Sequence, residues 1–126
     1  MKQLALRIAG FGFRSEATLE SLAQALDLLK HQYGAIDKLA AAHSMLSLVE
    51  ELGRLRGIEV ISVADAELPT VTTPTHSAQS LQARGTGSVA EAVALLAAGP
   101  NARLMGPRII SADRKATAAL AKGATE

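Results

Sequence analysis

The chain carries the sequence LALRIAGFGFRS at residues 4–15, and this stretch decides the fold. Residues 4–9 alternate large apolar side chains with other residues, which predicts a β-strand. Gly10 and Gly12 then predict a tight turn, because glycine adopts backbone angles that other residues avoid. Beyond the turn, leucines recur at steps of three and four residues over 19–29, which predicts an amphipathic helix that ends at Gly34. A strand, a glycine turn and a helix in this order are typical of an α/β domain.

A second glycine-rich turn is predicted at Arg84-Gly85-Thr86-Gly87, directly before another helix. Ser88 and Glu91 have the spacing of a capping box, which marks the start of that helix. Its end is predicted at Gly99-Pro100. For the first turn, Ser15 is the expected N-cap, with Glu16 placed favourably in the first helical turn.

The remaining apolar runs predict further elements of the same class. They are strands at 39–42, 58–63, 102–105 and 116–121, a helix from a capping box at 47–50 to Gly57 or alternatively Gly53, a helical turn at 65–68, a polar loop at 69–77 and a short helix at 77–83. The order predicts one domain, residues 1–126, of three-layer α/β/α architecture. Its sheet is expected to be mixed and mostly parallel, with about five strands, of which the last two pair antiparallel.

Composition excludes several classes of function. The formal net charge is +1 and only three residues are aromatic, so neither nucleic acid nor a membrane surface is an expected partner. The chain has no cysteine, which excludes disulfides, zinc–thiolate sites and thiol nucleophiles. No apolar run has spanning length and no signal peptide is recognisable, so a cytoplasmic location is expected. Neither a dinucleotide fingerprint nor a P-loop is present, and no cofactor is predicted.

The histidines offer little chemistry by their spacing. His31, His43 and His76 lack the close spacing of metal ligands, and no metal site is predicted. His31 is expected on the surface near the end of the first helix. No acid–base constellation is evident, so catalytic residues stay unknown, with His43 and His76 as candidate general bases.

Anion recognition is the best-supported chemistry, because both turns place an arginine close to a helix N-terminus. Helix N-termini offer unpaired N–H groups and a partial positive charge, and arginine can bind carboxylates through two hydrogen bonds. The predicted ligand-binding residues are Gly10, Phe11, Gly12, Phe13, Arg14, Ser15, Arg84, Gly85, Thr86, Gly87, Ser88 and Val89. The alternative is that both are ordinary turns between strand and helix, with glycine needed only for geometry.

The segment from Gly85 to Ala92, with the Ala-Leu-Leu-Ala-Ala-Gly run that ends at Gly99, resembles a family of cobalamin-biosynthesis proteins. This family contains CobE and the carboxy-terminal domain of CbiG. The Gly-Phe-Gly-Phe-Arg-Ser stretch and the closing segments around Leu104–Arg108 and Lys115–Ala118 fit it as well. The resemblance covers residues 3–122 and is closer to the stand-alone CobE members.

The resemblance implies an α/β/α domain that binds a carboxylate-rich precorrin or corrinoid intermediate of the aerobic pathway. A carrier or accessory role is expected, with other enzymes of that pathway as further candidate partners. One alternative is a hydrolase similar to cobalt-precorrin-5A hydrolase, which opens a lactone and releases a two-carbon fragment. A second alternative, unrelated to tetrapyrroles, is a small regulatory domain that binds a phosphate-bearing metabolite at the same turns.

Overall fold

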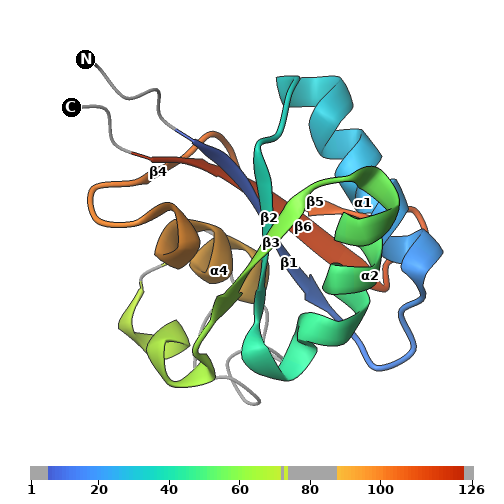
Figure 1. The fold of residues 1–126 in the computed structure, drawn as a ribbon, viewed down its shortest axis with the longest axis horizontal. Helices are drawn as coiled ribbons and strands as arrows, with labels where there is room; N and C mark the ends of the chain where they lie inside the picture. The colour runs from blue at the N-terminus through green and yellow to red at the C-terminus, as the bar shows by residue number, and fades with distance from the viewer. Residues whose placement is uncertain (1–5, 72, 74–87, 124–126) are drawn as a thin grey trace.

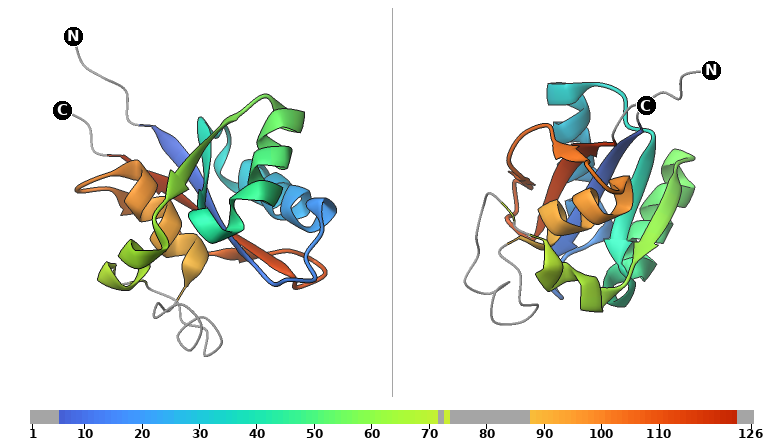
Figure 2. Two further views of the ribbon diagram at one scale, coloured as in Figure 1. Left: turned by 60° about the horizontal axis from the view of Figure 1, so that its bottom comes forward. Right: turned by 90° about the vertical axis from the view of Figure 1, so that its left-hand side faces the viewer.

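The protein is a three-layer α/β/α sandwich, as seen in a computed structural model that describes residues 6–71, 73 and 88–123. A central sheet separates two helices on one face, α1 (Leu19–Tyr33) and α2 (Leu46–Arg56), from α4 (Val89–Ala98) on the other. Figure 1 and the second view in Figure 2 show α4 lying along the sheet opposite the helix pair. The predicted α/β class and its layers are confirmed.

The sheet has six strands in the order β3-β2-β1-β6-β4, and β5 pairs with β6 outside this path. Their bounds are β1 Arg7–Phe13, β2 Lys38–Ala42, β3 Glu59–Val63, β4 Arg103–Leu104, β5 Ile109–Ile110 and β6 Ala116–Lys122. Strands β1, β2 and β3 are parallel, whereas β6 runs antiparallel to β1, β4 and β5. The mixed sheet is therefore confirmed, with parallel pairing confined to three strands and β6 next to the centre.

The first strand is longer than the sequence predicts, and the predicted turn at Gly10–Phe13 is wrong. Residues Gly10 to Phe13 continue β1 and pair with β6 in unbroken register, ending with Phe13 opposite Ala116. The glycines are needed because α4 packs on them: a Cβ atom on Gly10 would lie 2.5 Å from both the Ala90 carbonyl oxygen and the Ala94 nitrogen. Close backbone approach, rather than a turn, is the use of these glycines.

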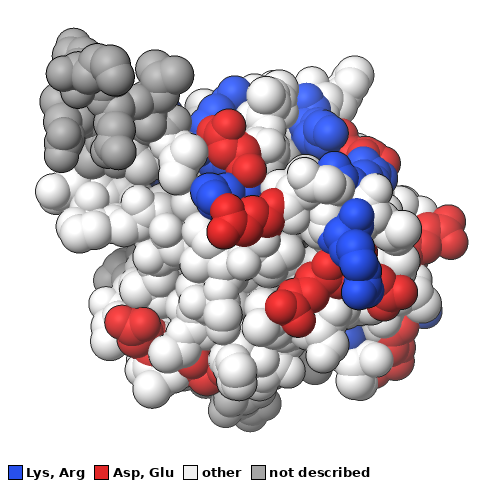
Figure 3. Space-filling model, viewed as in Figure 1, with Lys and Arg blue, Asp and Glu red and all other residues white. Residues whose placement is uncertain are grey.

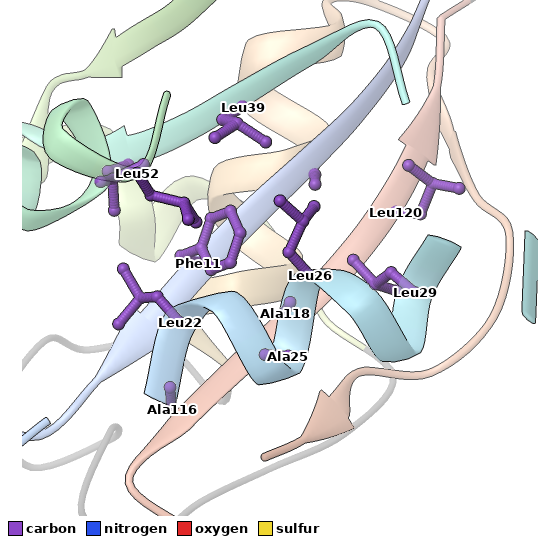
Figure 4. Packing of buried hydrophobic residues seen from close by; sticks show 13 residues of the cluster. Phe11, Leu22, Ala25, Leu26, Leu29, Leu39, Leu52, Ala116, Ala118 and Leu120 are labelled. Atoms are coloured by element: carbon purple, nitrogen blue, oxygen red, sulfur yellow. The ribbon is translucent and has the colours of Figure 1, made fainter. Parts of the chain in front are cut away.

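Each face of the sheet has its own apolar core. Successive side chains of β1 point alternately into the two cores, so that Phe11 lies in the core on the α1 side and Ile8 in the core on the α4 side. Leucines from α1 and from the strands surround Phe11 on the first side (Figure 4). On the α4 side the contacts are mostly alanine and valine, which allows the helix to lie close to the sheet. Strand β6 is apolar on both faces, as a central strand requires.

The helix starts differ from two of the predicted caps. Thr18, rather than Ser15, caps α1, in a reciprocal capping box with Ser21. Helix α2 has no side-chain cap, and Ser47 lies inside it instead of opening it. The predicted stops at Gly34 and Gly57 are confirmed, and Gly57 has the left-handed conformation common at helix ends.

Two short 3₁₀ segments complete the described elements, η1 (His43–Met45) after β2 and η2 (Asp65–Thr70) after β3. The helical turn predicted at 65–68 is confirmed and extends past Pro69. The predicted helix at 77–83 lies outside the described residues. Among the helices of the described ranges, none is both long enough and apolar enough to cross a membrane.

Replacing Gly10 with alanine is expected to destabilise the protein by about 3 kcal/mol. The added Cβ would clash with backbone atoms of α4, and these cannot move aside as a flexible side chain could. Urea unfolding followed by circular dichroism would measure this change. Gly57→Ala is the matched control: nothing lies within 4 Å of its added Cβ, and only its positive φ of 67° opposes the change. The control should lose about 1 kcal/mol. Equal losses for the two variants would contradict the close approach of α4.

Candidate functional site

Of the two segments predicted to bind an anion, the first contacts the described part of the second, Ser88–Val89, where α4 begins. A Cβ atom on Gly12 would lie 3.1 Å from the Cβ of Val89 and 3.2 Å from the backbone nitrogen of Ala90. The first turn of α4 therefore rests directly on the last part of β1. Ligands of open α/β sheets bind at the carboxyl ends of strands, and this junction lies at the carboxyl end of β1.

The register of β1, β6 and β5 determines which side chains share the face of the sheet on which α4 lies. Thr117 lies opposite Gly12 and its hydroxyl donates a hydrogen bond of 3.1 Å to the Gly12 carbonyl oxygen. Arg14 continues the pairing, since its backbone N–H donates to the Lys115 carbonyl oxygen at 3.0 Å. Ile110 lies opposite Thr117 on the other side of β6 and is 36% exposed. Because side chains alternate along strands, these positions share the face that α4 covers.

We name this group of residues the α4 shelf. It consists of Arg14, Lys115, Thr117, Ile110 and Val89.

The charge of the α4 shelf is positive on its open side. Arg14 and Lys115 are exposed, and neither takes part in the two ion pairs found in the described ranges. The pKa of Glu16 is lowered, first by a hydrogen bond of 2.6 Å from the Ser15 hydroxyl and then by the charges of Arg14 and Lys115. Both cations therefore lie near a single carboxylate. Their position close to a helix N-terminus suits an anionic ligand.

Several predicted ligand-binding residues have other positions than the sequence suggests. Phe11 is fully buried in the α1-side core, so it has no surface to offer a ligand in this conformation (Figure 4). Gly10 and Gly12 are covered by α4, and Phe13 packs, partly buried, on the α1 side. Arg84, Gly85, Thr86 and Gly87, as well as His76, lie outside the described residues. The structure brings Gly12, two residues before Arg14, against Val89 at the start of α4.

The predicted N-cap of α4, Ser88, is confirmed. The side chain of Glu91, the other residue of the predicted capping box, forms a hydrogen bond with a distant segment of the chain. The Ser88 hydroxyl accepts a hydrogen bond of 3.3 Å from the Glu91 backbone N–H. The Glu91 side chain is fully buried and its Oε2 atom accepts from the Arg108 backbone N–H at 2.9 Å. This bond joins the first turn of α4 to the segment that enters β5.

His43, the candidate general base that the structure describes, lies at the end of β2. Its Nδ1 atom is 3.4 Å from the Ser62 hydroxyl on β3, and both residues are exposed. Its neighbour Ser44 donates to the Asp65 carboxylate through its backbone N–H at 3.0 Å and through its hydroxyl. His31 is exposed in the last turn of α1, as predicted. Within the described ranges, no three His, Cys, Asp or Glu residues cluster as metal ligands would.

Sequence reasoning missed a polar clamp around Asp113. One carboxylate oxygen accepts from the Ser21 hydroxyl of α1 at 2.5 Å, and the other from the Ser111 hydroxyl at 2.6 Å and the Lys115 N–H at 3.0 Å. These bonds, led by the one from Ser111, lower the pKa of Asp113 to about 2. The clamp ties the start of α1 to the β5–β6 turn. The Ser-x-Asp pattern at 111–113 is a turn signal, but its partner on α1 is 92 residues away.

Comparison with known protein families gives a match over residues 7–121 to the family model described as the cobalamin synthesis G C-terminus. The chain belongs to this family. None of the curated proteins compared with it matches. The recognition made from the glycine-rich segments is thus confirmed, as is the assignment to cobalamin biosynthesis at the level of the family.

Two solved structures of cobalamin-biosynthesis proteins resemble this family member. CobE, described as a protein from the cobalamin (vitamin B12) biosynthetic pathway, matches with a TM-score of 0.86 and 29% identity, covering 100% of this chain and 96% of its own. The cobalamin biosynthesis protein chiG from Agrobacterium tumefaciens matches with a TM-score of 0.72 and 26% identity, covering 94% of this chain and 99% of its own. The match over whole chains confirms the fold.

The lowered pKa of Asp113 predicts an acid-dependent contribution to stability. The carboxylate stabilises the fold fully above its unfolded-state pKa of about 3.8, and this stabilisation is lost as the pH falls toward about 2. The difference in unfolding free energy between wild type and Asp113→Asn should therefore shrink as the pH is lowered from 5 to 2.5. Urea titrations at each pH would measure it. Glu50→Gln, at an exposed position of α2, is the control. A difference that stays constant with pH would contradict the clamp.

Proposed function

We propose that this protein binds a carboxylate-rich tetrapyrrole on the route to the corrin ring, as a carrier or accessory protein of cobalamin biosynthesis. Membership of the family supplies the pathway. The observation that carries the proposal is the contact of Gly12 with the first turn of α4 at the carboxyl end of β1, two residues before the exposed cation Arg14, whose backbone pairs with that of the exposed Lys115. Family membership alone leaves open which surface the ligand uses.

The chemistry of such ligands fits the α4 shelf. Corrin precursors carry acetate and propionate groups around an apolar macrocycle, so a binding surface needs cationic groups beside apolar contacts. Arg14 can hold a carboxylate through two hydrogen bonds, and Lys115 adds a second charge. Ile110 is 36% exposed and offers apolar contact, whereas Val89 is mostly buried at 8% exposure. Arg84, which precedes Ser88 in the sequence, is a further proposed contact.

Replacing both shelf cations should weaken binding of a corrin whose acetate and propionate side chains are free acids. Each charged hydrogen bond contributes about 1.5–3 kcal/mol, so Arg14→Ala with Lys115→Ala is expected to raise the Kd at least tenfold. Absorbance titration of the purified protein with the corrin would measure this. A corrin whose carboxylates are converted to amides lacks the charges that these cations bind. Its Kd should therefore be the same for the wild type and for the variant.

The matched control removes the same charge elsewhere. Lys30 and Arg54 are exposed on α1 and α2, away from the shelf, and Lys30→Ala with Arg54→Ala should leave the affinity unchanged. A Kd equal to that of wild type in the shelf variant would refute the site. No association of the free-acid corrin with the wild type would refute the tetrapyrrole proposal and favour the phosphate-binding regulatory alternative.

Hydrolysis of a precorrin lactone is the second candidate function, and the contact between His43 and Ser62 favours it. The imidazole could take a proton from a water molecule that attacks the lactone carbonyl carbon, while the ring C–O bond breaks and its oxygen is protonated. The same titration separates the two functions. A bound chromophore that is recovered unchanged supports a carrier, whereas a new spectrum that forms with turnover and is lost in His43→Gln supports the enzyme.

A further inference from the structure

Three basic residues lie directly opposite one another on three neighbouring strands, at the end of the sheet remote from the α4 shelf. Lys122 on β6 pairs with Arg7 on β1 and with Arg103 on β4. We name these residues the basic row. Figure 1 shows this end of the sheet, where β1 begins and β6 ends, near both ends of the chain.

The side chains of the basic row share one face of the sheet. Residues directly opposite in antiparallel strands point to the same side. For Arg7 that side is the one covered by α1, because its Nη2 atom donates to the carbonyl oxygen of Tyr33, the last residue of α1. Neighbouring strands lie about 4.8 Å apart, so the basic row is about 10 Å long. It continues the sheet surface past the end of α1.

Like charges directly opposite one another destabilise a sheet, so this arrangement needs compensation. Neither ion pair of the described ranges includes a member of the basic row; they join Lys38 to Glu59 and Arg56 to Asp27. The nearby carboxylate of Asp37 accepts from the backbone N–H of Arg7 at 2.8 Å. The Arg7 Nε atom is buried, and no hydrogen-bond partner is found for it in the part of the chain that the structure describes. The basic row thus carries a charge that its described neighbours balance only in part.

The surroundings of the basic row favour a macromolecular partner over a small anion. Arg103 and Lys122 are exposed on neighbouring strands, and the sulfur of Met105, which is 39% exposed, lies 3.7 Å from the Arg7 Nη2 atom. Small anions favour concave sites that surround them, whereas a row of cations across three strands with an apolar neighbour is suited to an extended acidic segment. On the face that Figure 3 shows, by contrast, charges of both signs are intermixed.

We propose that the basic row is a docking surface for an acidic segment of a partner protein. The proposal does not depend on the identity of the ligand at the α4 shelf. The row and the shelf lie at opposite ends of β1, about 20 Å apart for a strand of this length. A partner bound at the row therefore leaves the shelf open, as a protein that passes a ligand onward requires.

A dye-labelled peptide of eight glutamates is the probe for this surface, with fluorescence anisotropy at low ionic strength as the measurement. Lys122→Gln with Arg103→Gln should raise the Kd at least fivefold over that of wild type. Lys30→Gln with Arg54→Gln, which removes the same charge from the helix surfaces, should leave it within twofold. Arg7 is kept because its hydrogen bond to Tyr33 also holds the end of α1.

Three results would overturn the proposal. The first is that the wild type does not bind the peptide, and the second is that the Kd rises equally in the row and control variants. The third is that inorganic tripolyphosphate binds to the row as tightly as the peptide does. A second measurement tests the repulsion itself: without any added anion, Lys122→Gln should unfold at a higher temperature than wild type, and a lower temperature would contradict the argument. Binding of the free-acid corrin should be unchanged in the row variant, which keeps the two proposals separable.

Discussion

The close packing of α4 against β1 is the constraint on which the rest of the structure depends. Gly10 and Gly12 leave no side chain between the strand and the backbone of the helix, so Ala90 and Ala94 lie directly on the sheet. Any larger residue at Gly10 would force α4 away from the sheet, because protein interiors are closely packed and neighbouring atoms have little space to move aside. The alanine-rich composition of α4 and of the strands beneath it follows from the same need for closeness.

This packing also places the candidate site. Because α4 begins over Gly12, its first turn lies beside the end of β1, where Arg14 and Lys115 are paired through the backbone. The antiparallel β6 brings Thr117 to the same position, from a segment more than a hundred residues away in the sequence. A mixed sheet thus places a helix N-terminus beside β1 and leaves two cations directly next to the paired ends of β1 and β6. The family relationship assigns the pathway, and the α4 shelf is our proposal for where the ligand binds.

The sequence predicts the mixed sheet, the N-cap Ser88 and the order of the described elements except the short strand β5, because these depend on local patterns of apolar and capping residues. The error at Gly10–Phe13 has a physical cause. Glycine is disfavoured in strands, and its benefit here comes from α4, which is some 80 residues further along the chain. The Asp113 clamp and the neighbours of Arg14 depend on long-range contacts in the same way.

We propose that a carboxylate-rich macrocycle binds at the junction of β1 and α4. Titration of isotope-labelled protein with a free-acid corrin, followed by amide chemical shifts, tests this most directly. The account predicts that the largest shifts fall on Gly12, Arg14, Val89 and Thr117, while the amides of α2 stay in place. Largest shifts around His43 and α2, with no change at the start of α4, would contradict it.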